Sequence, residues 1–221
     1  IEKNLSSDQP LKGIALAILA TLLFAFLNSM TKHVSQVYPM VMILWFRYLF
    51  FGGYGLAVGL KYHKKRAFSS LVPILQITRA LLLLAEIGVY VFAFRHLPLA
   101  EISAISGAGP MVTMAMSSLI LREVITWRQW LIVVLGFVGI CIIVKPGFAS
   151  FDPWMLIPLF GTLLWGLYQV LTRLVSKYDG AERTTLFTGT IGFVILCTLL
   201  PFFWSPVDIN WLGKFSVLAI L

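Results

Sequence analysis

Residues 21–35 read TLLFAFLNSMTKHVS, and residues 162–176 read TLLWGLYQVLTRLVS. The two stretches align at a constant offset of 141 residues, with threonines, a carboxamide (Asn28 and Gln169) and a basic residue at matching positions. Two apolar helices share leucines by chance, but polar residues at one fixed offset are stronger evidence of relatedness. The pattern therefore predicts an internal repeat.

The composition around the repeat is that of a membrane protein. Of the 221 residues, 59% are hydrophobic and 12% are charged, whereas soluble domains average about 45–50% and about 25%. The mean hydropathy is +0.92. This composition excludes a soluble enzyme, a disordered chain and a nucleic-acid-binding module. The net charge of +8 comes from cations between the apolar runs, which is typical of membrane orientation signals.

Seven apolar runs are long enough to cross a membrane, because about 20 helical residues span a hydrocarbon core of about 30 Å. Backbone groups in lipid must pair within their own segment, so we expect an all-α, polytopic membrane helix bundle. The predicted spans are Leu11–Thr31, Pro39–Leu60, Leu71–Phe94, Leu97–Leu121, Trp127–Val144, Trp154–Thr172 and Thr184–Trp204, with an eighth beginning at Trp211.

The distribution of lysine and arginine predicts how the chain is threaded. Alternate connections carry eleven cations on one side and four on the other, and the richer side, with the N-terminus, is expected in the cytoplasm. Five predicted helices separate the two repeat copies, and five is odd. The second copy should therefore be inverted, with Lys32 and Arg173 at opposite faces. Inverted repeats are typical of secondary transporters.

The repeat also predicts the domain boundaries. The first repeat is expected over residues 11–147 with five helices, and a partial second repeat over residues 153–221. Adding 141 to Lys145 places the end of a complete second copy near residue 286. We therefore expect about ten helices in the intact protein.

The segment from His96 to Gly147 resembles drug/metabolite transporters of the EamA-domain type. It contains a helix of small residues with a central Pro110, Glu123 in LREVIT, and a closing Lys-Pro-Gly. Arg47 in ILWFRYLF matches a family arginine in the second helix. The resemblance implies a ten-helix inner-membrane carrier built from two five-helix repeats. It does not imply a particular substrate.

Three ionisable residues, Arg47, Arg79 and Glu86, fall inside predicted spans. Charges at that depth are costly and usually face a cavity or a partner. Arg79 and Glu86 are seven residues apart, so they should share a helix face, and all three residues form one predicted cluster. The cluster is interpreted either as a substrate or proton-coupling site or as a structural ion pair. Two arginines against one carboxylate favour an anionic or zwitterionic substrate.

A second group of residues is expected to line a polar cavity between the repeats. Small residues recur every three or four positions in the fourth span and form one predicted face, which serves helix packing or cavity lining. The candidates are Asn28, Trp45, Gln76, Tyr90, Ser103, Ser106, Gly107, Pro110, Trp165 and Gln169.

The sequence favours a secondary transporter of a small polar metabolite in the cytoplasmic membrane, working by alternating access. A channel or a structural membrane protein is the alternative, and an intramembrane enzyme is disfavoured because no nucleophile–base constellation is apparent. No catalytic residues, cofactor, metal ligands or nucleic-acid partner are expected. The oligomeric state cannot be derived from the sequence.

Overall fold

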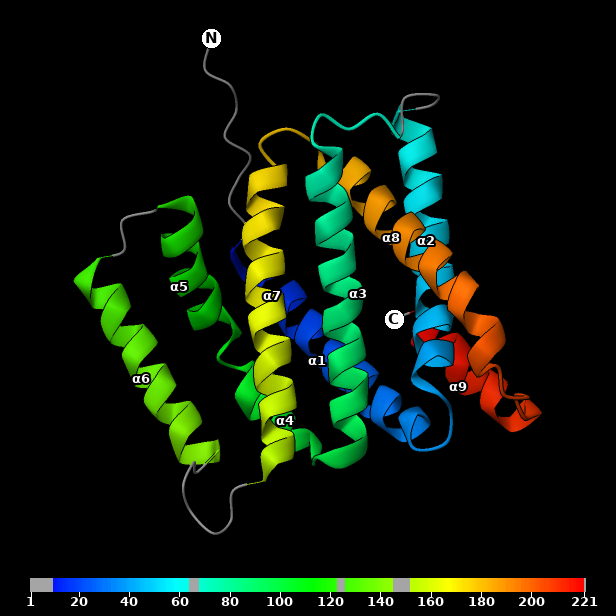
Figure 1. The fold of residues 1–221 in the computed structure, drawn as a ribbon, viewed down its shortest axis with the longest axis horizontal. Helices are drawn as coiled ribbons and strands as arrows, with labels where there is room; N and C mark the ends of the chain where they lie inside the picture. Colours follow the sequence, from blue (N-terminus) through cyan, green and yellow to red (C-terminus); the bar gives the residue numbers. More distant parts are fainter. Residues whose placement is uncertain (1–9, 64–67, 123–125, 145–151, 221) are drawn as a thin grey trace.

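The computed structural model describes residues 10–63, 68–122, 126–144 and 152–220, and every regular element in these ranges is helical (Figure 1). The predicted all-α class is therefore confirmed. The elements are α1 (Pro10–Ser35), α2 (Met40–His63), α3 (Pro73–His96), α4 (Leu99–Ser106), α5 (Gly109–Leu121), α6 (Trp127–Val144), the 3-10 turn η2 (Pro153–Met155), α7 (Leu156–Val175), α8 (Ala181–Phe203) and α9 (Ile209–Ile220). Glu123, Lys145 and Pro146 lie outside the described residues.

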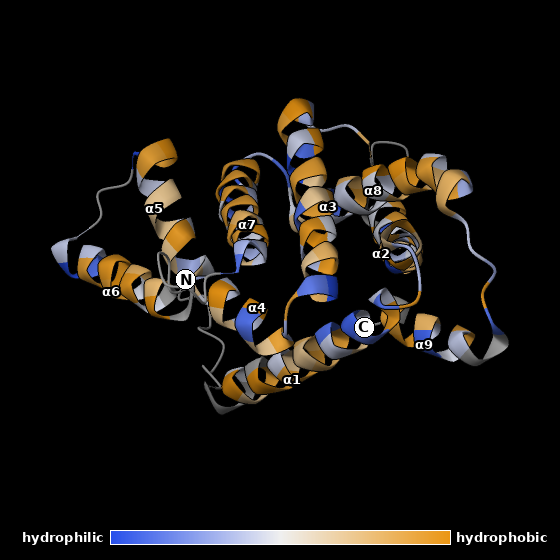
Figure 2. Cartoon of the chain, turned by 60° about the horizontal axis from the view of Figure 1, so that its bottom comes forward, coloured by the Kyte–Doolittle hydropathy of each residue, from blue (hydrophilic) through white to orange (hydrophobic). Residues whose placement is uncertain are grey.

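Six stretches are long and apolar enough to cross a membrane, which agrees with a polytopic bundle. They are Gly13–Ser35, Met40–Lys61, Pro73–His96, Leu99–Leu121, Pro153–Val175 and Ala181–Phe203, and α6 adds the shorter apolar stretch Trp127–Gly139. Large apolar side chains such as Leu22 and Phe137 are mostly exposed, and Figure 2 shows this apolar surface along the helices. Such a surface is suited to contact with lipid tails.

The fourth span is not one continuous helix, which corrects the sequence prediction. It consists of α4 and α5, separated at Gly107 and Ala108. Pro110 is the second residue of α5 and cannot donate a backbone hydrogen bond to α4. The predicted single face of small residues is therefore divided between two helices.

The helices form two rows. In Figure 1, α7 and α3 lie side by side in the centre, with α5 and α6 on one flank and α2 and α8 on the other. The second row, seen along the lower edge in Figure 2, contains α4, α1 and α9. The most extensive helix contact joins α2 to α8. There, a Cβ atom on Gly189 would lie 2.8 Å from the Cα atom of Gly52, so glycine is needed for this close approach.

The ends of α1 and α7 have the same local hydrogen bonds at the offset of 141. The Thr31 hydroxyl donates to the Leu27 carbonyl at 2.7 Å, and the Thr172 hydroxyl donates to the Tyr168 carbonyl at 2.8 Å. In the turns that follow, four backbone N–H groups donate to carbonyls in matched pairs: Val37 to Val34 and Tyr178 to Val175, then Tyr38 to Val34 and Asp179 to Val175. The helices α2 and α8 begin 141 residues apart, at Met40 and Ala181.

Candidate functional site

The candidate site is a pocket of about 660 Å³ between α5, α6 and α7. Its walls are two facing stripes of residues spaced at one helical turn, with Gln129 contributed by α6. The α5 stripe is Pro110, Thr113, Met114 and Ser117, and the α7 stripe is Trp165, Gln169, Thr172, Arg173 and Ser176 at the helix end. This volume is within the range of about 300–1,000 Å³ for small-molecule sites.

Glycines at the α5–α7 contact position the aromatic part of the pocket. A Cβ atom on Gly109, the first residue of α5, would lie 3.3 Å from the Cδ1 atom of Trp165. A Cβ atom on Gly166 would lie 2.8 Å from Val112. The helix break before Gly109 therefore coincides with the close approach of α5 to the indole of Trp165.

Three of the ten predicted cavity residues, Pro110, Trp165 and Gln169, line this pocket. Among the described contacts, Gln169 has no hydrogen-bond partner. Arg173 at the helix end donates to the Ser117 hydroxyl at 3.1 Å. The pocket thus combines an indole, two carboxamides, several hydroxyls and one guanidinium.

The other predicted cavity residues lie elsewhere. Tyr90 joins α3 to α7 through the Thr162 hydroxyl at 3.0 Å, and Trp45 donates to the Cys197 sulfur in α8 at 3.3 Å. Ser103, Ser106 and Gly107 belong to the end of α4, where the Ser106 hydroxyl and the Gly107 N–H donate to the Ser103 carbonyl. Asn28 is half-buried on α1, and Gln76 is fully buried at the start of α3.

Arg79 does not join Glu86, because its guanidinium is held by α7 and α8. It donates to the Tyr168 hydroxyl at 3.0 Å, to the Thr184 carbonyl at 2.8 Å and to the Thr188 hydroxyl. The side chain is 2% exposed. Arg79 therefore connects three helices through neutral acceptors, so the predicted cluster of three charges is divided.

Glu86 and Arg47 remain together on facing parts of α3 and α2. Glu86 is 8% exposed and Arg47 is half-buried, and their opposite charges attract each other. Within the described ranges, neither residue has an ion-pair partner within 4.0 Å or a side-chain hydrogen bond. The geometry thus leaves a buried carboxylate near one arginine.

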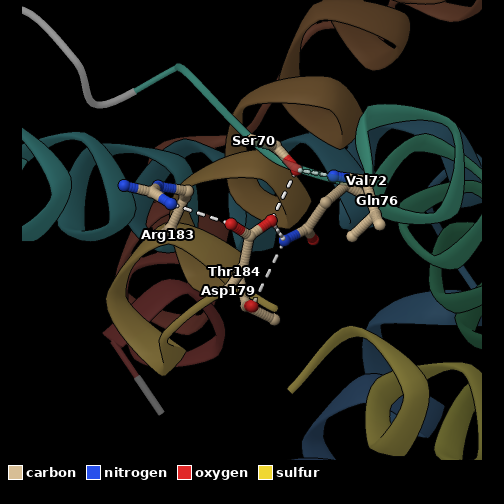
Figure 3. A network of polar contacts seen from close by, with 6 residues as sticks. All are labelled: Ser70, Val72, Gln76, Asp179, Arg183 and Thr184. Carbon is tan, nitrogen blue, oxygen red and sulfur yellow. Dashed lines mark hydrogen bonds and ion pairs between the residues drawn. The ribbon is translucent and has the colours of Figure 1, made fainter. Parts of the chain in front are cut away.

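A polar network joins the start of α3 to the turn between α7 and α8 (Figure 3). We call Ser70, Gln76, Asp179 and Arg183 the Asp179 latch. The Asp179 carboxylate accepts hydrogen bonds from Ser70 at 2.5 Å, Gln76 at 3.0 Å and Arg183 at 2.8 Å. Burial of the carboxylate raises its pKa, but these three donors and the charge of Arg183 outweigh burial, so the pKa of Asp179 lies below its ordinary value.

An aromatic cluster lies at the other end of the bundle. We call His33, Tyr38, Trp211 and Phe215 the Tyr38 clasp. The ring of Tyr38 meets Trp211 edge-on at 5.5 Å between centroids and Phe215 at 5.1 Å, and His33 stacks on Trp211 at 5.2 Å. The Tyr38 hydroxyl also accepts the backbone N–H of Asp208 at 3.2 Å.

Comparison with known proteins identifies the family. The sequence profile of the EamA-like transporter family matches residues 11–145. The chain belongs to this family.

The chain is also similar to named bacterial transporters. It is 24% identical over 163 residues to an S-adenosylmethionine uptake transporter of Rickettsia prowazekii, covering 74% of this chain and 55% of that protein. It is 29% identical over 105 residues to a riboflavin transporter of Brucella anthropi, covering 48% and 37%, and 24% identical over 204 residues to a pseudopaline exporter of Pseudomonas aeruginosa, covering 87% and 66%. The chain thus spans between about a third and two thirds of these relatives.

Sequence reasoning missed the Asp179 latch and the partners of Arg79 in this EamA-family chain. Asp179 is an acidic residue in a short turn between two apolar helices, which ordinarily indicates a solvated loop. Tyr168 and Thr172 are four residues apart on one helix, so they present two hydroxyl groups on one face. That spacing is the available signal for the polar contact with Arg79.

Proposed function

We propose that the protein is a secondary transporter that moves a small polar metabolite across the cytoplasmic membrane by alternating access. Residues 11–147 form the first repeat and residues 153–221 belong to the second, inverted repeat. The cavity between the repeats is exposed first to one side of the membrane and then to the other.

The observation that carries this proposal is a pair of matched contacts at the two ends of the bundle. Ser70 contacts Asp179 in the latch, and Trp211 contacts Tyr38 in the clasp. Adding 141 to 70 gives 211, and subtracting 141 from 179 gives 38, so each contact is the counterpart of the other. Both contacts join a residue before or within the third helix of one repeat to the first turn of the other repeat. Two such contacts at opposite ends are suited to serve as the two gates of a carrier.

Lys32 and Arg173 support the inverted orientation. Lys32 donates to the carbonyl of Leu97, between α3 and α4, at 2.7 Å, whereas Arg173 donates to Ser117 near the end of α5. In Figure 1, these places are at the bottom and the top of the bundle, respectively. The equivalent cations of the two copies therefore point to opposite faces.

Glu86 and Arg47 are the proposed coupling residues, with Arg79 as their neighbour on α3. A buried carboxylate that lacks a close ion-pair partner is suited to bind a proton or a substrate cation during the cycle. The two arginines leave a positive excess, which favours an anionic or zwitterionic substrate. Arg79 contributes to this excess because its partners are neutral.

The relatives named above carry S-adenosylmethionine, riboflavin and pseudopaline. These names support a small metabolite as the substrate. They differ in direction, since two kinds of relative are importers or transporters and the third is an exporter. The direction of transport is therefore set by coupling, and the proposal concerns the carrier mechanism.

Counterflow in proteoliposomes tests the proposal. Vesicles containing the intact protein are loaded with unlabelled S-adenosylmethionine or riboflavin, and uptake of the same labelled compound is measured. A carrier accumulates label transiently above equilibrium, whereas a channel only equilibrates it. Glu86→Gln and Arg47→Ala should abolish counterflow without loss of insertion, and Arg128→Gln on the exposed start of α6 is the control. Equilibration without overshoot, or full counterflow in both variants, would contradict the carrier or the coupling site, respectively.

A further inference from the structure

The pocket between α5 and α7 changes in chemical character along its length. Trp165 and Pro110 lie at the end nearest the helix break, whereas Ser117 and Ser176 lie at the opposite end. Trp165 and Ser176 are 11 residues apart on α7, which corresponds to about 16 Å along the helix axis. The pocket therefore has an aromatic inner end and a hydroxyl-rich outer end.

Trp165 is fixed as a flat surface at the inner end. Its ring lies 5.4 Å from the ring of Tyr168, and Gly109 leaves room for its edge on the α5 side. On the opposite wall, α5 contributes the thioether of Met114, a polarizable group that contacts aromatic rings favourably. A planar ring therefore finds an aromatic surface on one wall and a soft sulfur atom on the other.

Gln169 lies one helical turn beyond Trp165 on the same face of α7 and lines the same pocket. Its carboxamide offers a donor and an acceptor side by side, and none of the described residues occupies them. A carboxamide pairs in two-point fashion with the edge of a nitrogen heterocycle, as it does with adenine. Stacking on an aromatic side chain adds binding that tolerates different rings.

We propose that this pocket binds the substrate and that the substrate carries a planar nitrogen heterocycle with a hydroxylated substituent. The ring stacks on Trp165, Gln169 reads its edge, and the substituent extends along the hydroxyls of Thr113 and Thr172. This inference rests on the proposed transport function, and it adds the chemical class of the cargo.

Ligand-induced thermal stabilisation of the intact protein in detergent tests the inference. The planar probes are adenosine, cytidine and lumichrome, and the non-planar controls are ribose and glutamate. At least one planar probe should raise the melting temperature through binding to the folded state, and ribose and glutamate should not. Trp165→Ala should abolish the shift, Trp165→Phe should retain most of it, and Gln169→Ala should weaken binding about tenfold or more.

Trp204→Ala is the control, because this exposed tryptophan follows α8 and lies outside the pocket. The melting temperatures of the unliganded variants report whether each one folds. Stabilisation by no planar probe, or equal stabilisation of the wild type and both Trp165→Ala and Gln169→Ala, would overturn the inference.

Counterflow separates this result from the transport proposal. Trp165-dependent binding without counterflow of the bound probe would retain the site and contradict the carrier. Counterflow of glutamate that is unchanged by Trp165→Ala would retain the carrier and contradict the heterocycle.

Discussion

Tyr38 and Asp179 occupy the same position in the turns after α1 and α7, 141 residues apart, and each contacts the other half of the chain. The backbone bonds of the two turns agree, but the side chains differ. Asp179 is held by charge-assisted hydrogen bonds, whereas Tyr38 is held by ring contacts and one hydrogen bond. The two ends of the bundle are therefore stabilised by different forces, and different conditions should weaken each of them.

The Asp179 latch should lose its contribution to stability in acid. The pKa of Asp179 is lowered on folding, so the stabilisation is complete above the ordinary aspartate pKa of about 3.9 and is lost as the pH falls through the folded-state value. Asp179→Asn should lower the free energy of unfolding at pH 7 by roughly 2 kcal/mol, because hydrogen bonds to a charged group are removed.

Thermal unfolding of both proteins between pH 3 and pH 8 measures this effect. The difference between wild type and Asp179→Asn should be constant from pH 6 to pH 8 and should narrow below about pH 4. A difference that widens in acid would contradict the assignment. The clasp variant Tyr38→Leu provides the comparison, since its cost should not follow the titration of a carboxylate.

Gly189→Ala should force α2 and α8 apart. The added methyl group would lie 2.8 Å from the Cα atom of Gly52 and 2.9 Å from the Phe51 carbonyl oxygen, and neither backbone atom can rotate away. Overpacking of this kind costs about 1–3 kcal/mol. Gly53→Ala on the same helix pair is the matched control, because no atom lies within 4 Å of its added Cβ. Equal melting temperatures for the two variants would show that the helices adjust freely.

Arg79→Lys should destabilise the protein although it keeps the charge. The guanidinium reaches acceptors on both α7 and α8, and a single ammonium cannot reproduce that planar fork. We expect a loss of about 1–3 kcal/mol, measured by thermal unfolding, with Arg128→Lys on the exposed start of α6 as the control. A wild-type melting temperature for Arg79→Lys would contradict a structural role and would favour a role in the transport cycle.

The helices of this fold were predictable because membrane crossing imposes a length and an apolar composition that local sequence carries. The predicted span Pro39–Leu60 agrees with α2 within a few residues. The break at Gly107 and Ala108 was not predicted, because a proline within an apolar run is compatible with a kinked helix as well as a broken one. Deciding between them requires the packing of α5 against Trp165.

The site was less predictable because side-chain partners depend on which helices meet. Trp165 and Gln169 were found from the repeat and their polar character. The seven-residue spacing of Arg79 and Glu86 correctly placed both on α3, but the partners of Arg79 come from residues 168 to 188, about 90 to 110 positions later. Helix periodicity carries no information on contacts at that separation.

If the latch and the clasp are alternating gates, weakening one end should close the other. Reporter thiols placed by Ser176→Cys near the latch end of the pocket and by Ser205→Cys near Tyr38 measure access at the two ends, in a background where Cys141 and Cys197 are replaced by serine. Asp179→Ala should raise the rate of thiol modification at position 176 and lower it at position 205, because opening one side of an alternating-access carrier shifts population away from the other. Trp211→Ala should have the reverse effect. A change of about 1.4 kcal/mol in the balance of the two states corresponds to a tenfold change in their ratio, so the rates should shift by severalfold. Rates that rise at one end and stay constant at the other would mean that the two ends open independently, and the gates would then not be coupled.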